Sequence, residues 1–193
     1  MFLQKETPIE PVCYCRAQFQ GNFILCKKQD PLRELKETFL GLNLRFLTHN
    51  IKKIFQIIDW VQLHHKNIVF ITCSDEDTHL YRALPYSWDL LDLRTLDFKQ
   101  EQPYNIHYLL SMRFHACVWA ALSSIPFCGI IHDPKLSYLC SQLKQAQLKL
   151  SEFNPSLLQP LLTKDHYSES QENLKTNVCI LHEKSHNYRD LFI

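Results

Sequence analysis

Three short runs of apolar, mostly β-branched or aromatic residues constrain the fold most strongly. They are Ile68–Thr72, Ile106–Leu110 and Phe127–Ile131. Each has the length of a strand, and apolar side chains follow one another along it instead of alternating with polar ones. That pattern is typical of strands covered on both faces. Helical patterns separate the runs, so the sequence predicts an α/β fold: a three-layer, Rossmann-like parallel sheet with helices on both faces.

The expected helices are recognised by apolar spacing and by their first residues. An apolar stripe runs from Ile51 to Leu63, and Ser74 precedes three acidic residues that suit the first turn of a helix. Small apolar residues from Ala116 to Leu122 predict a third helix. Asp133-Pro134 can begin another that continues through Leu143 and beyond.

Other segments give weaker patterns. Trp88–Leu93 fits a short strand or a turn, and Val12–Arg16 a short strand. Helical spacing after Asp30-Pro31 predicts a further helix, with its apolar positions at Leu32, Leu35, Phe39 and Leu42. The polar stretch 168–175 is expected to be a loop, and 177–193 a closing helix.

The length of 193 residues suits one α/β domain with an appendage. We expect a linker over residues 1–11, a single Rossmann-like domain over 12–165, and a loop with a C-terminal helix over 166–193.

Composition argues against several classes of protein. The net charge is +1, with 21 basic and 20 acidic residues, whereas nucleic-acid-binding domains carry a basic excess. No apolar run approaches the roughly 20 residues that span a bilayer, and the first residues do not resemble a signal peptide. The chain is therefore expected to be cytoplasmic, with no transmembrane segment and no nucleic-acid partner.

Glycine and cysteine usage excludes two kinds of motif. The only glycines are Gly21, Gly41 and Gly129, so neither a G-x-G-x-x-G fingerprint nor a P-loop is present. Eight cysteines include no C-x-x-C pair. Cys13 and Cys15 have no second pair nearby, and no metal site is expected.

The most informative stretch runs from Leu110 to Lys135. It contains Met112-Arg113-Phe114-His115, then a small-residue helix, Pro126, an apolar strand with Gly129, and Asp133-Pro134-Lys135. This series resembles the C-terminal half of the polysaccharide pyruvyl transferases, a two-domain family with a GT-B-like fold. His132 departs from that family, which usually has Tyr or Ser there. Arg16 at the end of a short strand and Asp77 before a helix resemble it more weakly.

The resemblance implies an activity. Enzymes of this family transfer the enolpyruvyl unit of phosphoenolpyruvate onto a sugar and form a ketal across two hydroxyl groups. It implies phosphoenolpyruvate as donor, a glycan as acceptor, and no cofactor. Because the family's active site lies between two domains, a separate protein corresponding to the N-terminal half is a possible partner. Two alternatives are a non-catalytic binding module and half of a sugar-nucleotide glycosyltransferase.

The residue types fit this chemistry. Arginine presents a fork of donors to carboxylate or phosphate, and histidine transfers protons near neutral pH. We assign donor binding to Arg113 and Arg16, acid catalysis or phosphate binding to His115, placement of the sugar to Asp77, and substrate binding to Lys135.

Each assignment has a structural alternative. Arg113 could pair with an acidic residue, and His115 could be a buried histidine. Asp77 could be part of a helix N-terminal turn, and Lys135 a solvated lysine. Residues two apart in a helix point about 200° apart, so Arg113 and His115 can share a ligand only in extended chain. We therefore expect the helix to begin at or after His115.

Overall fold

The computed structural model describes residues 38–96 and 104–189, with side chains described as far as Ile180. The expected linker over 1–11, the strand Val12–Arg16, the helix start at Asp30-Pro31 and the candidate Arg16 all lie outside the described residues.

Six parallel strands form one sheet, in the order β3-β2-β1-β4-β5-β6. Their bounds are Phe39–Asn43 (β1), Ile68–Thr72 (β2), Asp89–Asp92 (β3), Ile106–Ser111 (β4), Phe127–Ile131 (β5) and Ala146–Lys149 (β6). The helices are Ile51–His64 (α1), Asp75–Ala83 (α2), Phe114–Leu122 (α3), Pro134–Leu143 (α4), Leu158–Leu161 (α5) and Lys164–Arg189 (α6). Short 3₁₀ turns occupy Thr48–Asn50, Leu150–Glu152 and Pro155–Leu157.

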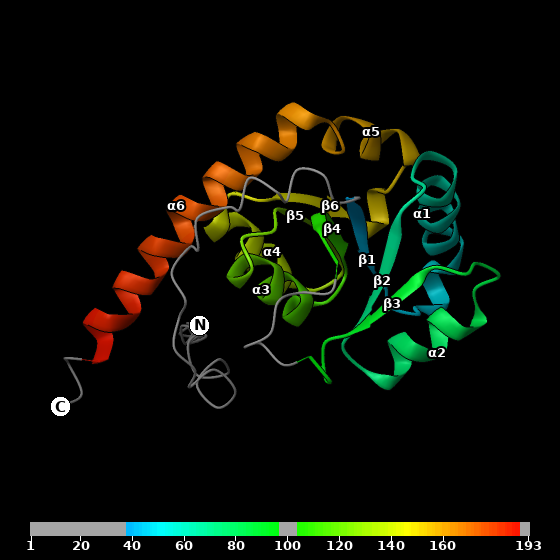
Figure 1. The fold of residues 1–193 in the computed structure, drawn as a ribbon, viewed down its shortest axis with the longest axis horizontal. Helices are drawn as coiled ribbons and strands as arrows, with labels where there is room; N and C mark the ends of the chain where they lie inside the picture. The colour runs from blue at the N-terminus through cyan, green and yellow to red at the C-terminus, as the bar shows by residue number, and fades with distance from the viewer. Residues whose placement is uncertain (1–37, 97–103, 190–193) are drawn as a thin grey trace, which may run out of the picture.

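Helices cover both faces of the sheet, as expected (Figure 1). One buried cluster joins α1, α2 and α5 to the Leu40, Phe70 and Tyr108 side of the strands. The other joins α3, α4 and α6 to the Val69 and Leu109 side. The fold is therefore a three-layer, Rossmann-like parallel α/β sheet.

Helix starts follow local hydrogen bonds. Ser74 caps α2, where its hydroxyl accepts from the Asp77 amide at 3.4 Å. Asp133 caps α4, where its carboxylate accepts from the amides of Lys135 at 2.8 Å and Leu136 at 3.1 Å. Both caps satisfy amide groups that have no partner within the helix.

The prediction of a helix through Phe39 and Leu42 is wrong. Phe39–Asn43 is a strand, β1, between β2 and β4 at the centre of the sheet. At Gly41 an added Cβ would lie 3.1 Å from the side chains of both Ile71 and Leu109. Neighbouring side chains thus fill the space above this glycine, and tertiary packing overrides the helical spacing.

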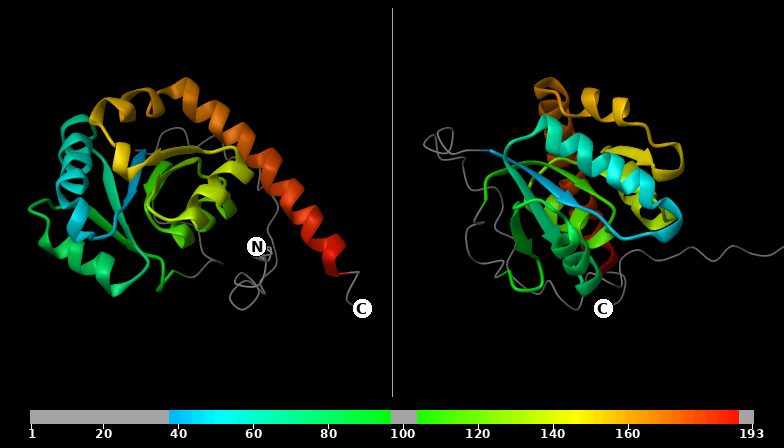
Figure 2. Two further views of the ribbon diagram at one scale, coloured as in Figure 1. Left: turned by 180° about the vertical axis from the view of Figure 1, so that it is seen from behind. Right: turned by 90° about the vertical axis from the view of Figure 1, so that its right-hand side faces the viewer.

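Two further expectations near the C-terminus are wrong. The helix that begins at Pro134 ends at Leu143, where Lys144 adopts a left-handed conformation, and the edge strand β6 follows. Residues 168–175 are not a loop, because α6 runs unbroken from Lys164 to Arg189. Leu174 of α6 is fully buried and packs against the α3–α4 layer. The last turns of α6 project beyond the sheet (Figures 1 and 2).

Gly129 shows why α4 lies so close to β5. An added Cβ there would lie 2.5 Å from the Cys140 sulfur and 3.2 Å from Leu136. We expect Gly129→Ala to lower the free energy of unfolding by about 1–3 kcal/mol through overpacking, as measured by urea denaturation. Adding Cys140→Ala should recover part of the loss, and a Gly129→Ala protein as stable as the parent would contradict this packing.

Candidate active site at the carboxyl edge of the sheet

The strand order reverses between β1 and β4, and polar residues gather where these two strands end. The chain leaves β1 toward β2 on one side and β4 toward β5 on the other. In open α/β sheets, ligands bind at this kind of reversal, beyond the carboxyl ends of the strands. Asn43 is the last residue of β1, Ser111 is the last of β4, and Arg113 follows two residues later.

Asn43 joins the two strand ends. Its side-chain oxygen accepts from the Ser111 hydroxyl at 3.0 Å and from the Arg113 amide at 3.1 Å. Its side-chain nitrogen donates to the Ile71 carbonyl at 2.8 Å and to Asp77 Oδ2 at 3.4 Å. Asn43 and Ser111 are both fully buried. Together these contacts fix the backbone of Arg113 relative to β1, β2 and β4.

A buried ion pair then fixes the Arg113 side chain. Asp77 Oδ1 accepts from Arg113 Nε at 2.9 Å and from Nη2 at 2.6 Å. The Arg113 side chain is 18 % exposed and that of Asp77 is 0 % exposed. Asp77 Oδ2 accepts from the Cys73 amide at 3.0 Å. Asp77 is therefore hydrogen-bonded on both oxygens, and it positions Arg113.

Two further groups accept hydrogen bonds from the guanidinium. Arg113 Nη2 donates to the Ser74 hydroxyl at 2.9 Å and to Glu76 Oε2 at 3.0 Å. Nη1 makes no hydrogen bond to any residue that the structure describes. The arginine is thus held through one side of its fork, and the other side can receive a ligand.

Burial and charge act in opposite directions on this pair. Burial of Arg113 favours a lower pKa, but hydrogen bonds and charges from Asp77, then Glu76, outweigh it and raise the pKa. Nearby, burial raises the pKa of the Cys73 thiol to about 12, with a further contribution from Asp77. Arg113 therefore stays cationic, and Cys73 stays a neutral thiol, at physiological pH.

Arg45 and His132 extend the site outward. Arg45 Nε lies 3.5 Å from Glu76 Oε2. Burial lowers the pKa of His132, Asp133 opposes that effect, and the charges of Arg45 and Arg113 lower the pKa further. Two arginines and a neutral histidine therefore lie near one another at this edge. No sequence pattern pointed to Arg45, and His132 stood out only as a departure from the family.

The expectation that α3 begins at or after His115 is wrong by one residue, so the condition of extended chain holds for Arg113 and not for His115. The helix begins at Phe114, one residue before His115, and Arg113 precedes it in extended conformation (φ −104°, ψ 128°). His115 lies in the first turn and is exposed. No hydrogen bond or ion pair joins it to Arg113 among the described residues. Lys135 lies in the first turn of α4 at the same edge and is exposed.

The first turn of α3 adds donors for an anion. Arg113 makes no side-chain cap hydrogen bond to this helix, so the first amides have no partner from the cap residue. Helix N-termini attract anions through these amides and through the helix dipole. Beside Arg113 Nη1 and Arg45, they suit a small ligand with a carboxylate or a phosphate.

The loop after β1 is unlike that of a dinucleotide-binding protein. It runs from Leu44 to Asn50 and contains no glycine. Leu44 is fully buried, and Arg45 and Phe46 follow it. Pyrophosphate cradles in Rossmann folds need glycines there so that the backbone can approach the phosphates. The strand order is that of dinucleotide-binding folds, but this loop lacks their cradle.

Comparisons with known proteins give a likeness in fold. No protein-family model and no curated protein matches the chain. Among solved structures, it is similar to one described as the glycotransferase of kitacinnamycin, with a TM-score of 0.44 and 11 % sequence identity. The match covers 84 % of this chain and 43 % of that one. The chain thus spans less than half the length of that protein.

Within residues 38–96 and 104–189, no helix combines the length and apolarity that a membrane span requires. In the same residues, no group of three or more His, Cys, Asp or Glu side chains is placed to hold a metal ion.

Proposed function

We propose that this chain is the donor-binding half of a transferase that acts on glycans, and that its donor is phosphoenolpyruvate. The supporting observation is the orientation of Arg113 at the strand-order reversal, where buried Asp77 holds one side of the guanidinium. An arginine fixed in this way loses little side-chain entropy when it binds an anion.

The chemistry follows from the neighbouring groups. Arg113 Nη1, Arg45 and the first amides of α3 would bind the donor's carboxylate and phosphate. His115 would deliver a proton to the methylene carbon, which becomes a methyl group. One sugar hydroxyl then adds to the central carbon, phosphate leaves with the bridging oxygen, and a second hydroxyl closes the ketal. One hydroxyl proton replaces the proton that His115 gave to the methyl group and the other leaves on the phosphate, so hydrogen phosphate is the only product besides the ketal.

Lys135 and Asp77 have different roles in this proposal, because only Lys135 would contact the substrate. Lys135, in the first turn of α4, remains a candidate substrate ligand at the same edge. Asp77 has both carboxylate oxygens engaged by Arg113, Cys73 and Asn43. We therefore propose that Asp77 acts through Arg113 and does not itself place the sugar, the role that the sequence had suggested for it.

Two other functions fit less well. A sugar-nucleotide site would need a diphosphate cradle, and the loop after β1 has Arg45 and Phe46 where glycines would be. A pure binding module should expose one continuous apolar surface. The large exposed apolar side chains of the described residues are Phe46, Phe55, Leu63, Leu90, Leu122, Tyr138, Leu157 and Ile180, and no observation gathers them into one surface.

Thermal unfolding with and without phosphoenolpyruvate tests the donor. At about 100 times the dissociation constant, a ligand stabilises the fold by about 2.7 kcal/mol, or several degrees for a chain of this size. We expect that shift in the parent and a much smaller one in Arg45→Ala. Arg113→Lys keeps a cation beside Asp77 but loses the fork, so it should fold and bind the donor weakly.

Arg94→Ala is the matched control. Arg94 is also near the carboxyl edge, but it pairs with Asp92 of β3 and Asp75 of α2, away from the strand-order reversal. This variant should respond to phosphoenolpyruvate as the parent does. A folded parent that shows no shift, or one stabilised by a nucleotide sugar instead, would refute the proposed donor.

A further inference from the structure

The Glu76 carboxylate contacts both arginines that are proposed to bind the donor. Its Oε2 accepts from Arg113 Nη2 at 3.0 Å and lies 3.5 Å from Arg45 Nε. Among the described residues, Arg45 Nε has no hydrogen-bond partner, so Glu76 neutralises Arg45 without giving this nitrogen an acceptor. One carboxylate oxygen of the chain itself therefore does what an anionic ligand of the two arginines would do.

The charges of this cluster cancel. Arg45 and Arg113 carry two positive charges, and they pair with two carboxylates. Those carboxylates belong to Asp77 and Glu76. An anion that entered with all four groups in place would meet charges that sum to zero, and it would lie beside a like charge on Glu76. Like charges oppose binding at such distances. Binding of an anionic donor therefore favours a cluster from which one carboxylate has moved away.

Glu76 is the carboxylate that is free to move. Asp77 is 0 % exposed and accepts from Arg113 through two hydrogen bonds and from the Cys73 amide. The Glu76 side chain is 63 % exposed, and it accepts one hydrogen bond from the described residues. When Glu76 leaves, Arg113 Nη2 keeps Ser74 and Asp77 as acceptors. Exposed ion pairs contribute little to stability, so release of Glu76 is easy.

We propose, on the basis of the proposed function, that Glu76 competes with the donor for Arg45 and Arg113. Its carboxylate pairs with the arginines before the donor binds, and an anionic group of the donor replaces it. The Ser74 cap holds the start of α2, so only the Glu76 side chain has to move. The tethered carboxylate weakens every anion at this site by the same factor. A donor with two anionic groups makes enough contacts to bind in spite of it.

Isothermal titration calorimetry with phosphoenolpyruvate and with inorganic phosphate tests the competition in the full chain. Glu76→Gln keeps the shape of the side chain and removes its charge. An exposed ion pair accounts for a factor of up to about five in affinity, and the lost repulsion adds to it. We therefore expect Glu76→Gln to bind both anions about three- to tenfold more tightly than the parent. Equal or weaker binding of both anions by Glu76→Gln would overturn the proposal.

Asp75→Asn is the matched control. Asp75 precedes Glu76 in the same turn of α2, but its carboxylate pairs with Arg94. This variant makes the same change of net charge close to the site, and it should alter both affinities by less than about twofold. If Asp75→Asn tightened binding as much as Glu76→Gln does, general charge would explain the effect, and the proposal would be wrong.

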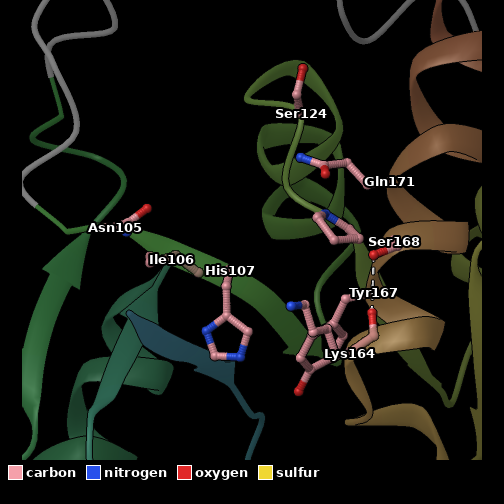
Figure 3. A pocket seen from close by; sticks show the side chains of 9 residues that line it. Asn105, Ile106, His107, Ser124, Lys164, Tyr167, Ser168 and Gln171 are labelled. Carbon is pink, nitrogen blue, oxygen red and sulfur yellow. Dashed lines mark hydrogen bonds between the residues drawn. The ribbon is translucent and has the colours of Figure 1, made fainter. Parts of the chain in front are cut away.

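Lys164→Gln tests whether the anion binds at another place. Lys164 lines a hollow between the start of β4 and the first turn of α6, at the amino-terminal edge of the sheet (Figure 3). We expect this variant to bind both anions as the parent does. Loss of binding in Lys164→Gln would place the measured anion far from Arg45 and Arg113, which contradicts the competition.

A second readout follows Glu76 itself. In protein labelled with ¹³C at the glutamate carboxyl groups, the NMR signal that is missing from Glu76→Gln belongs to Glu76. This signal should shift as phosphate is added, along the same saturation curve as the calorimetric binding. A Glu76 signal that stays in place while phosphate saturates the protein would show that the carboxylate is not displaced, and the proposal would fail.

The outcomes distinguish this inference from the proposed function. Tighter binding of phosphate by Glu76→Gln, with no binding of phosphoenolpyruvate by either protein, would support the competition and refute the donor. Phosphoenolpyruvate binding that is equally tight in both proteins would keep the donor and refute the competition.

Discussion

Asp77→Ala should lower the free energy of unfolding by about 3–5 kcal/mol, the usual cost of breaking a buried ion pair by removing one partner. The Asp77 carboxylate is fully buried and binds Arg113 through two hydrogen bonds. Its loss leaves the Arg113 guanidinium paired only with the exposed Glu76 carboxylate among the described residues, and it also removes the acceptor of the Cys73 amide. Urea denaturation at neutral pH measures the change.

Asp75→Ala is the matched control, because Asp75 lies in the same helical turn but is exposed. Its partner Arg94 is a surface side chain, and surface pairs contribute little to stability. The double variant Asp77→Leu with Arg113→Met removes both buried charges. It should cost less than the sum of the single changes. If Asp77→Ala were no more harmful than Asp75→Ala, the ion pair would not be what holds Arg113.

The loss should also appear in ligand binding. Without Asp77, Arg113 is free to adopt other rotamers, and it must be ordered again when an anion binds. We therefore expect Asp77→Ala to weaken phosphoenolpyruvate binding although Asp77 touches no ligand in the proposed site. This distinguishes a positioning role from that of a sugar ligand, which would leave donor binding unchanged.

The central strands could be predicted from the sequence because burial on both faces makes their runs continuously apolar. Ile68–Thr72 and Phe127–Ile131 have the predicted bounds, and β4 extends one residue beyond its prediction. β1 lacked that apolar pattern because Gly41 interrupts it. In addition, Phe39 and Leu42 continue the helical spacing of Leu32 and Leu35. β6 is an edge strand of four residues, and its alternate residues are exposed. Four residues are too few for this alternation to predict a strand.

The site was predictable to the extent that it follows predicted strands. Arg113 comes two residues after β4 and was predicted as a site residue, and the structure places it at the carboxyl edge. Asn43 ends β1 and Arg45 follows two residues later, so assigning Phe39 and Leu42 to a helix concealed both. The pairing of Asp77 with Arg113 joins residues 36 apart, and it depends on the placement of β1 between β2 and β4. No local pattern contains that information.

Asn43→Asp should destabilise the fold strongly, in a way that depends on pH. The side-chain nitrogen that now donates to Ile71 and Asp77 would be replaced by an acceptor facing a carbonyl and a second carboxylate. Burial and the like charge of Asp77 would raise the pKa of the introduced group. A shift of roughly three units corresponds to about 4 kcal/mol at high pH.

The direction in which stability changes with pH follows from proton binding. With its folded-state pKa raised above the unfolded value, the folded protein binds more protons than the unfolded chain, so acid favours the fold. Relative to the parent, the loss of stability should be small near pH 4 and should grow as the pH rises through the raised pKa. Denaturation by urea at pH 5 and pH 8 compares the two regimes. Asn43→Ala, which removes the same hydrogen bonds without adding a titrating group, should show a deficit that differs little between them. A deficit for Asn43→Asp that is equally independent of pH would mean that the introduced group does not face Asp77, and the buried network would have to be redrawn.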